Sequence, residues 1–144
     1  MEAYFVRDYN ANDYDEVIRI WKSTGMGGEE RGDNEKTIDD SLKIGGRFLL
    51  LIEKETSQII GTSWMTFDGR RILLHHFGID PAFQGRGLSR ILMRESMKHV
   101  KDKGYQVKLE VHQSNKRAIF LYKSYGFKYL GDYEIYIIRD VSKI

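Results

Sequence analysis

The sequence predicts an α/β protein with a mixed, mostly antiparallel central sheet flanked by about four helices. Segments with strand-like and helix-like spacing of apolar residues alternate along the chain. Asp68-Gly69 separates two apolar runs, a typical signal of an antiparallel hairpin. A long helical pattern over 87–103 joins two strand patterns, which favours a right-handed crossover between parallel strands. We therefore expect antiparallel strands before Pro81 and one parallel pair around the long helix.

In the first part of the chain, a strand is expected over 3–7, and apolar residues at helical spacing follow it. Asp13 precedes this helix, and Glu16 lies three residues further on, the spacing of a capping box, so Asp13 is the expected N-cap. Three glycines, Gly25, Gly27 and Gly28, end the helix. A shorter helix is expected over about 37–44.

The middle and the end of the chain continue the alternation. Strands are expected over 48–53, 59–67 and 71–79, the long helix over 87–103 with Gly104 as its end, and a strand to about residue 112. A last helix, 115–125, ends at Gly126, and 127–138 supplies the final strand or strands.

Length and composition predict one domain, residues 1–144. With 41% hydrophobic and 31% charged residues, the chain is expected to be globular and to have no membrane partner. Residues 1–9 contain three charges and no apolar run of a signal peptide, so we expect a cytoplasmic protein. The chain has no cysteine, which excludes a disulfide scaffold and a thiolate zinc site, and we expect no metal.

The segment after Pro81 carries the strongest chemical signal. Proline ends the strand, and Gln84-Gly85-Arg86-Gly87-Leu88-Ser89 leads directly into a helix. A helix N-terminus presents unpaired N–H groups and binds anions such as phosphate, although an ordinary turn would fit the spacing equally well. The segment is not a P-loop, because no Gly-Lys-Ser/Thr follows, and Arg90 stands where a dinucleotide fold needs its third glycine.

This turn resembles the acyl-CoA loop of the GNAT family of N-acetyltransferases, Gln/Arg-x-x-Gly-x-Gly/Ala. The matching residues are Gln84 and Gly87, whereas Ser89 departs from the usual last residue but is also small.

A second block is similar to the family's other signature, Asn-x-x-Ala-x-x-x-Tyr followed by Gly-Phe. Here it reads Asn115, Ala118 and Tyr122, with Gly126-Phe127 after them. Two motifs in this order identify the chain as a member of the family, and the block also resembles ribosomal-protein N-terminal acetyltransferases.

The resemblance implies transfer of an acetyl group from acetyl-CoA to a primary amine, with the parallel strand pair splayed at the cofactor cleft. The cofactor-binding residues that it implies are Phe77, Ile79, Gln84, Gly85, Arg86, Gly87, Leu88, Ser89, Asn115, Ala118 and Tyr122. From Gln84 to Lys108 the chain carries seven Lys or Arg and two acidic residues, a charge that suits a polyanionic ligand. Gly78 indicates either a close approach of the strand backbone or simple packing. The net charge of +2 is too small to predict a nucleic-acid partner.

The resemblance also implies catalytic roles. Tyr122 is the expected acid for the leaving thiolate, and the backbone N–H of Ile79 the donor to the oxyanion. Glu110 is the first candidate for the base that deprotonates the ammonium, and His75 is the second. His75 and His76 are neighbours on a strand, so we expect them to point to opposite faces. Without cysteine, an acetyl-cysteine intermediate is impossible, which leaves direct attack in a ternary complex.

The acceptor is not readable from the sequence, and a small amine, an amino acid, an antibiotic or a peptide N-terminus would fit. Six acidic and two basic residues in 23–41 would attract a cationic acceptor or form a solvated loop. Tyr125, Tyr129, Tyr133 and Tyr136 are candidates for an acceptor pocket or a dimer face, in a monomer or homodimer. The chain looks like a compact bacterial stand-alone acetyltransferase; the alternatives are a non-catalytic acyl-CoA-binding regulatory module and a nucleic-acid binder that uses the basic helix.

Overall fold

The computed structural model describes residues 2–28 and 31–144. By their contacts these residues divide into two compact units, one that ends at Leu109 and one that comprises Glu110–Ile144. The expectation of a single domain remains a prediction. None of the helices in the described ranges is long and apolar enough to cross a membrane.

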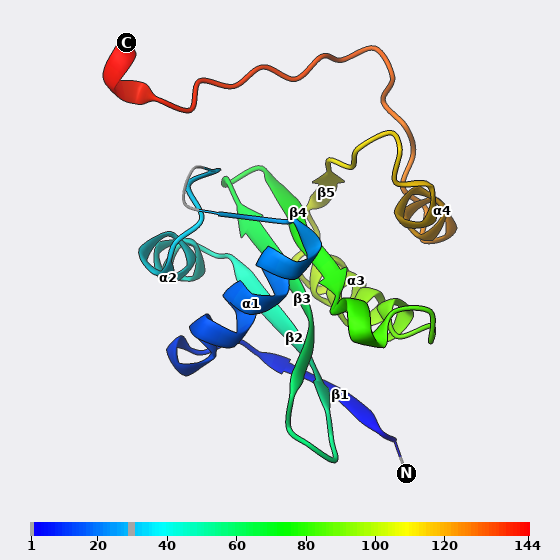
Figure 1. Ribbon diagram of the computed structural model, residues 1–144. Coiled ribbons are helices and arrows are strands. Elements are labelled where there is room, and N and C mark those ends of the chain that lie inside the picture. The colour runs from blue at the N-terminus through cyan, green and yellow to red at the C-terminus, as the bar shows by residue number, and fades with distance from the viewer. Residues whose placement is uncertain (1, 29–30) are drawn as a thin grey trace. The chain divides into compact units, whose positions relative to one another are not determined.

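The first unit contains a five-stranded sheet in the order β1-β2-β3-β4-β5 (Figure 1). The pairs β1–β2, β2–β3 and β3–β4 are antiparallel, and the pair β4–β5 is parallel. This sheet confirms the predicted fold class. The strands are β1 (Tyr4–Asp8), β2 (Arg47–Glu53), β3 (Ile59–Phe67), β4 (Arg71–Ile79) and β5 (Gln106–Leu109).

Helices cover both faces of this sheet because the strand residues alternate between two apolar sets. On one face, Trp64 of β3 contacts the two helices α1 (Tyr14–Thr24) and α2 (Glu35–Lys43), through Trp21 and Ser41. On the other face, the hydroxyl groups of Ser63 and Ser96 lie 2.7 Å apart, and Ser96 belongs to α3 (Ser89–Lys103). The crossover helix α3 therefore lies opposite α1 and α2.

Stacked aromatic rings form the core between the sheet and α1. The ring of Phe48 stacks on Tyr9, Trp21 and Trp64 at centroid distances of 4.7, 5.9 and 5.9 Å. Both indoles are satisfied: Trp21 Nε1 donates to Thr62 Oγ1, and Trp64 Nε1 donates to Ser41 Oγ. Since buried polar groups without partners are costly, these two bonds fix the ring orientations as well as the packing.

The predicted N-cap position of the first helix is confirmed, but the predicted capping box is wrong. Asp13 is the N-cap residue of α1 (Tyr14–Thr24), but its side chain makes no capping hydrogen bond to that helix. Asn10 is the N-cap of the preceding 3-10 turn Ala11–Asp13, where the side chains of Asn10 and Asp13 form a capping box. Asp13 also pairs with Arg7 at 2.8 Å, a partner on β1 that the helical spacing does not reveal. The predicted partner, Glu16, instead accepts a hydrogen bond from the backbone of Ile59.

The prediction that His75 and His76 face opposite ways was also wrong. Between two paired positions, Thr62↔Gly78 and Trp64↔His75, β4 contains one residue more than β3, which is a β-bulge. His76 has a φ of +48°, and its carbonyl accepts a hydrogen bond from Thr62 Oγ1 at 2.7 Å. Because the bulge breaks the alternation, both imidazoles point to the same side of the strand.

Two expectations about the last third of the chain differ from the structure. β5 ends at Leu109, where its pairing with Leu74 of β4 ends, so Glu110 and His112 lie outside the strand. Residues 127–138 form no strand, because in the described part of the chain they pair with no neighbouring strand. An alternating pattern becomes a strand only where a partner satisfies its backbone groups. The second unit contains α4 (Lys116–Ser124) and the short turn Val141–Lys143.

Candidate active site

The end of β4 extends beyond its parallel neighbour β5. The β4–β5 ladder covers only Arg71–Leu74, whereas β4 continues to Ile79 in pairing with β3. The N–H of Asp80 donates to the carbonyl of Ile60 at 2.8 Å, toward β3. Since successive N–H groups of a strand point to opposite edges, the N–H of Ile79 points away from β3. β4 therefore has an edge beyond Leu74 that β5 does not pair with, while the splayed parallel pair that the resemblance implies stays a prediction, because β5 is paired along its whole length.

The turn after β4 is held by side chains of the turn itself and of α1. Asp80, which is 5% exposed, accepts from the N–H of Ala82 at 3.0 Å and pairs with Arg19 at 3.0 Å. Gln84 Nε2 donates to the carbonyl of Ile79 at 2.9 Å. The glutamine of the motif therefore ties the turn back to the strand end.

The two glycines of the turn have backbone conformations that other residues rarely adopt. Gly85 and Gly87 have φ values of +81° and +72°, and an added Cβ would meet no atom within 4 Å at either position. Glycine is thus required for conformation and not for space. In the described part of the chain, the N–H groups of Arg86, Gly87 and Leu88 make no backbone hydrogen bond, and α3 begins directly after them. These groups and the helix dipole can bind an anion.

Two further residues of this region have clear surroundings. The guanidinium of Arg86 lies 5.0 Å from the ring centroid of Phe83, a cation–π arrangement at the entrance to the turn. At Gly78 an added Cβ would come within 2.7 Å of the Met26 side chain. The close approach at Gly78 is therefore packing against Met26, the second of the two interpretations that the sequence left open. Phe77 is half-buried on the same strand end.

The second unit contains the other motif residues. Asn115 caps α4, because its Oδ1 accepts from the N–H of Ala118 at 3.2 Å. Tyr122 is 9% exposed and lies edge-on to Phe127, and burial raises the pKa of its phenol to about 12. Glu110 is exposed and lines a shallow hollow with Val111, His112, Gln113 and Ile135.

The histidines of β4 form a hydrogen-bonded group in the first unit. The Nδ1 atoms of His75 and His76 lie 2.6 Å apart, and His76 Nε2 lies 2.8 Å from Asp33 Oδ2. Burial, together with the smaller effect of the neighbouring His76, lowers the pKa of His75 to about 3. Sequence reasoning assigned Asp33 only to the acidic segment, and no local pattern indicates a partner 43 residues away.

Two features were candidates for binding the acceptor, the acidic segment 23–41 and the four tyrosines of residues 125–136. In the acidic segment, Glu29 and Glu30 lie outside the described residues, Asp33 is buried against His76, and Asp40 pairs with Lys36. The tyrosines do not line the hollow around Glu110, and three of them are more than three-quarters exposed: Tyr129, Tyr133 and Tyr136.

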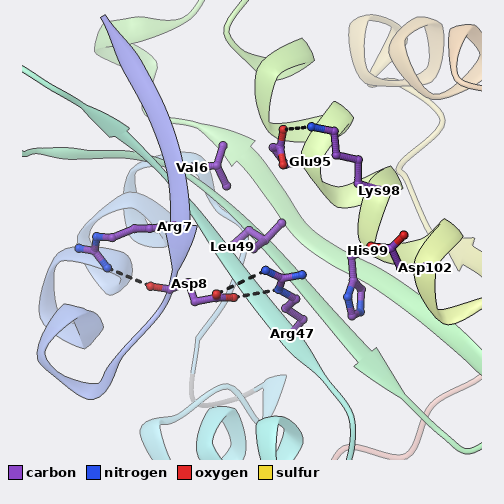
Figure 2. A pocket seen from close by; sticks show the side chains of 9 residues that line it. All are labelled: Val6, Arg7, Asp8, Arg47, Leu49, Glu95, Lys98, His99 and Asp102. Atoms are coloured by element: carbon purple, nitrogen blue, oxygen red, sulfur yellow. Dashed lines mark hydrogen bonds and ion pairs between the residues drawn. The ribbon is translucent and has the colours of Figure 1, made fainter. Parts of the chain in front are cut away.

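A separate hollow lies between β1, β2 and α3 (Figure 2). Four of its charged side chains pair with one another: Arg47 bonds Asp8 at 2.9 Å, and Lys98 bonds Glu95 at 2.7 Å. We assign no ligand to it. No group of three or more metal-ligating side chains gathers within 2–28 and 31–144.

A mixed α/β sheet with one parallel pair, joined by a crossover that begins with a glycine turn at the start of α3, defines a class of α/β proteins whose helix start can accept an anion. Comparison with known families gives the class a name. The profile of the acetyltransferase (GNAT) family matches residues 14–127, and the chain belongs to this family of acyltransferases.

Solved structures of similar fold include three with different stated roles. An acetyltransferase from Streptococcus agalactiae has a TM-score of 0.79 and 18% identity, over 96% of this chain and 93% of that one. The ribosomal-protein-S18-alanine N-acetyltransferase of Escherichia coli has a TM-score of 0.73 and 21% identity, over 87% and 77%. The glucosamine-6-phosphate N-acetyltransferase of Arabidopsis thaliana has a TM-score of 0.74 and 17% identity, over 95% and 100%. At these identities the likeness establishes the fold.

Proposed function

We propose that this protein transfers the acetyl group of acetyl-CoA to a primary amine by direct attack in a ternary complex. The observation that carries the proposal is the turn at Arg86–Leu88, whose N–H groups lie at the N-terminus of α3 beside the end of β4. Such a turn suits the pyrophosphate, and the basic residues of α3 suit the remaining charge of this cosubstrate. The pantetheine amides would pair with the backbone of Phe77 and Ile79.

In the proposed reaction the amine nitrogen attacks the thioester carbon, and the carbon–sulfur bond breaks. The N–H of Ile79 stabilises the oxyanion, and Tyr122 donates its phenolic proton to the leaving thiolate. The raised pKa of Tyr122 keeps the phenol protonated at neutral pH, which an acid requires. The ammonium proton goes to Glu110 or to His75, the two bases that the sequence indicates.

The acceptor is a primary amine of a small molecule or a peptide. Two of the structural neighbours are named for acetylation of a ribosomal-protein alanine and of glucosamine-6-phosphate, so one fold serves both kinds. Cytoplasmic location and a monomeric or homodimeric state belong to the same proposal.

The first test is thermal unfolding with acetyl-CoA, with CoA and without ligand. A ligand at about 100 times its Kd adds about 2.7 kcal/mol to the free energy of unfolding, so the melting temperature rises clearly. An unchanged melting temperature up to millimolar acetyl-CoA would rule out the proposed function.

The second test is a panel of primary amines with detection of released CoA thiol. The panel contains polyamines, free amino acids, aminoglycosides and short peptides with free N-termini. Binding of acetyl-CoA without thiol release from any amine would favour the non-catalytic acyl-CoA-binding module. Binding of any polyanion that weakens steeply with salt and that CoA does not displace would favour a nucleic-acid binder.

A further inference from the structure

We propose that Asp33, His76 and His75 form a proton relay that accepts the ammonium proton of the acetyl acceptor, with His75 Nε2 as its outer end. This inference rests on the proposed function and names the base of that reaction. It also gives a role to Asp33, which no sequence motif marks.

The hydrogen-bond geometry fixes the tautomer of each ring. Asp33 Oδ2 also accepts from the N–H of Gly28 at 3.3 Å, so this carboxylate is an acceptor on both sides. With Asp33 ionised, the neutral ring of His76 donates from Nε2 and presents a lone pair on Nδ1. The N–H at Nδ1 of His75 then donates to Nδ1 of His76 across the 2.6 Å contact. The lone pair on Nε2 of His75 is left to accept a proton.

Neighbouring residues hold the three hydrogen-bonded side chains of the relay in place. The His76 ring lies 4.3 Å from Trp21, and the His75 ring lies 4.4 Å from Trp64, both measured between centroids. At Gly27 an added Cβ would come within 2.9 Å of both Asp33 Oδ2 and His76 Nε2, so the loop passes directly over their contact. The bulge with its φ of +48° at His76 brings the two imidazoles together. A strained backbone at a bulge inside a strand, held by several hydrogen bonds, is typical of a functional position.

The pKa shifts of the two imidazoles favour proton transfer from His75 to His76. Protonation of His75 is unfavourable, because burial lowers the pKa of its imidazole to about 3. The pKa of His76 is lowered by burial and by Arg31, but the charge and hydrogen bond of Asp33 act in the opposite sense. A proton received at His75 is therefore more stable after transfer to His76, beside the carboxylate.

The proton balance is simple. One N–H bond of the ammonium breaks, and its proton binds the lone pair of His75 Nε2. The proton on His75 Nδ1 moves to His76 Nδ1, which leaves neutral His75 and an imidazolium paired with ionised Asp33. One proton then leaves to solvent through the reverse path, which restores the initial tautomers of both histidines. His75 lies two residues before Phe77, on the strand end proposed to bind pantetheine.

The test uses Asp33→Asn, which keeps the size of the side chain and an acceptor oxygen but removes the charge. Asp40→Asn is the matched control, because Asp40 lies in the same segment and pairs with exposed Lys36. His75→Gln removes the outer end of the relay and is the second variant. Thermal unfolding establishes that each variant is folded and retains the shift with acetyl-CoA.

For Asp33→Asn and His75→Gln we expect kcat to fall about 100-fold or more with the best amine of the panel, and Asp40→Asn to have no effect. Wild-type activity falls as the pH drops through the pKa of His76, because a protonated relay accepts no proton. Loss of the Asp33 charge lowers that pKa, so the acid limb moves to lower pH in Asp33→Asn. A structural role alone would not move the limb.

A readout without acceptor is the nitrogen NMR of the imidazoles in the uniformly ¹⁵N-labelled protein. We expect the proton on Nε2 of His76 and on Nδ1 of His75 at neutral pH. The opposite tautomers would overturn the relay. So would an unchanged kcat and pH profile in both variants, with the proposed function intact if acetyl-CoA binds and amine turnover continues. Absence of acetyl-CoA binding would overturn the proposed function, and the relay with it.

Discussion

Tyr122 shows how burial prepares one side chain for the proposed chemistry. The Tyr122 side chain is nearly buried, and desolvation raises the pKa of its phenol to about 12. A group with this pKa holds its proton throughout the pH range in which a primary amine is a good nucleophile. The motif predicts the residue, whereas the raised pKa is a consequence of packing.

Exchange of Tyr122 for Phe is expected to lower kcat about 100-fold, because the ring remains but the proton donor is lost. Thiol release measures kcat, and the melting shift with acetyl-CoA, which should not change, measures binding. Tyr129→Phe is the matched control, since that ring is 87% exposed. Full turnover in Tyr122→Phe would remove this residue from the mechanism.

The turn between β4 and α3 shows how an element converts sequence into a binding geometry. Gly85 and Gly87 take left-handed conformations, Gln84 anchors the turn to Ile79, and Asp80 caps its start. The motif predicted the glycines and the glutamine. The contact of Asp80 with Arg19 joins residues 61 positions apart and has no local signal.

Gly87→Ala is expected to destabilise the protein by roughly 1 kcal/mol and to weaken acetyl-CoA binding, since alanine resists the φ of +72° and shifts the N–H groups. Gly69→Ala is the control, because Gly69 has a φ of +88° in the β3–β4 hairpin and also has no atom within 4 Å of an added Cβ. Urea unfolding and ligand titration measure the two effects. Equal acetyl-CoA affinity in both variants would contradict the proposed role of the turn.

The cap of α4 makes a separate prediction about an element. Asn115→Ala removes the acceptor for the N–H of Ala118 and should destabilise the helix by about 1 kcal/mol, whereas Asn115→Asp should restore most of the loss. Circular dichroism during urea unfolding measures both. If the alanine variant is as stable as the parent, the cap does not contribute.

For the whole molecule, the buried histidines link stability to pH. His75, His76 and His99 all have lowered pKa values, with burial as the largest cause. The unfolded chain binds protons at these histidines at a higher pH than the folded chain. Their neutral forms therefore favour folding above about pH 6.5, and this contribution is lost as the pH falls.

We expect the free energy of unfolding to fall by about 2 kcal/mol between pH 6.5 and pH 5 from His75 alone, because its pKa in the fold is about 3. Urea unfolding at several pH values measures the slope. His75→Gln should make the slope smaller, whereas His112→Gln, at an exposed position, should leave it unchanged. Identical slopes for the two variants would contradict the burial of His75.

The sequence predicts the family, the order of the elements and the turn at 84–89. These features depend on local spacing and on backbone conformations that glycine and proline favour. The capping contacts of α1 could not be predicted, since the Asp13 side chain bonds Arg7 of β1 and the backbone N–H of Asn10 instead of the first turn of that helix. The strand expected over 127–138 failed because pairing with a neighbour, and not alternation, makes a strand.

The histidine pair shows the same division most clearly. Local alternation predicts opposite faces for His75 and His76, and nothing near them in sequence indicates Asp33. Opposite the β3 segment from Thr62 to Trp64, β4 contains one extra residue, and this bulge reverses that prediction. The loop before α2 brings the carboxylate of Asp33 to His76. Spacing along the chain encodes local conformation, whereas a bulge and a distant partner depend on the register between strands, which is set only when the sheet and its helices pack together.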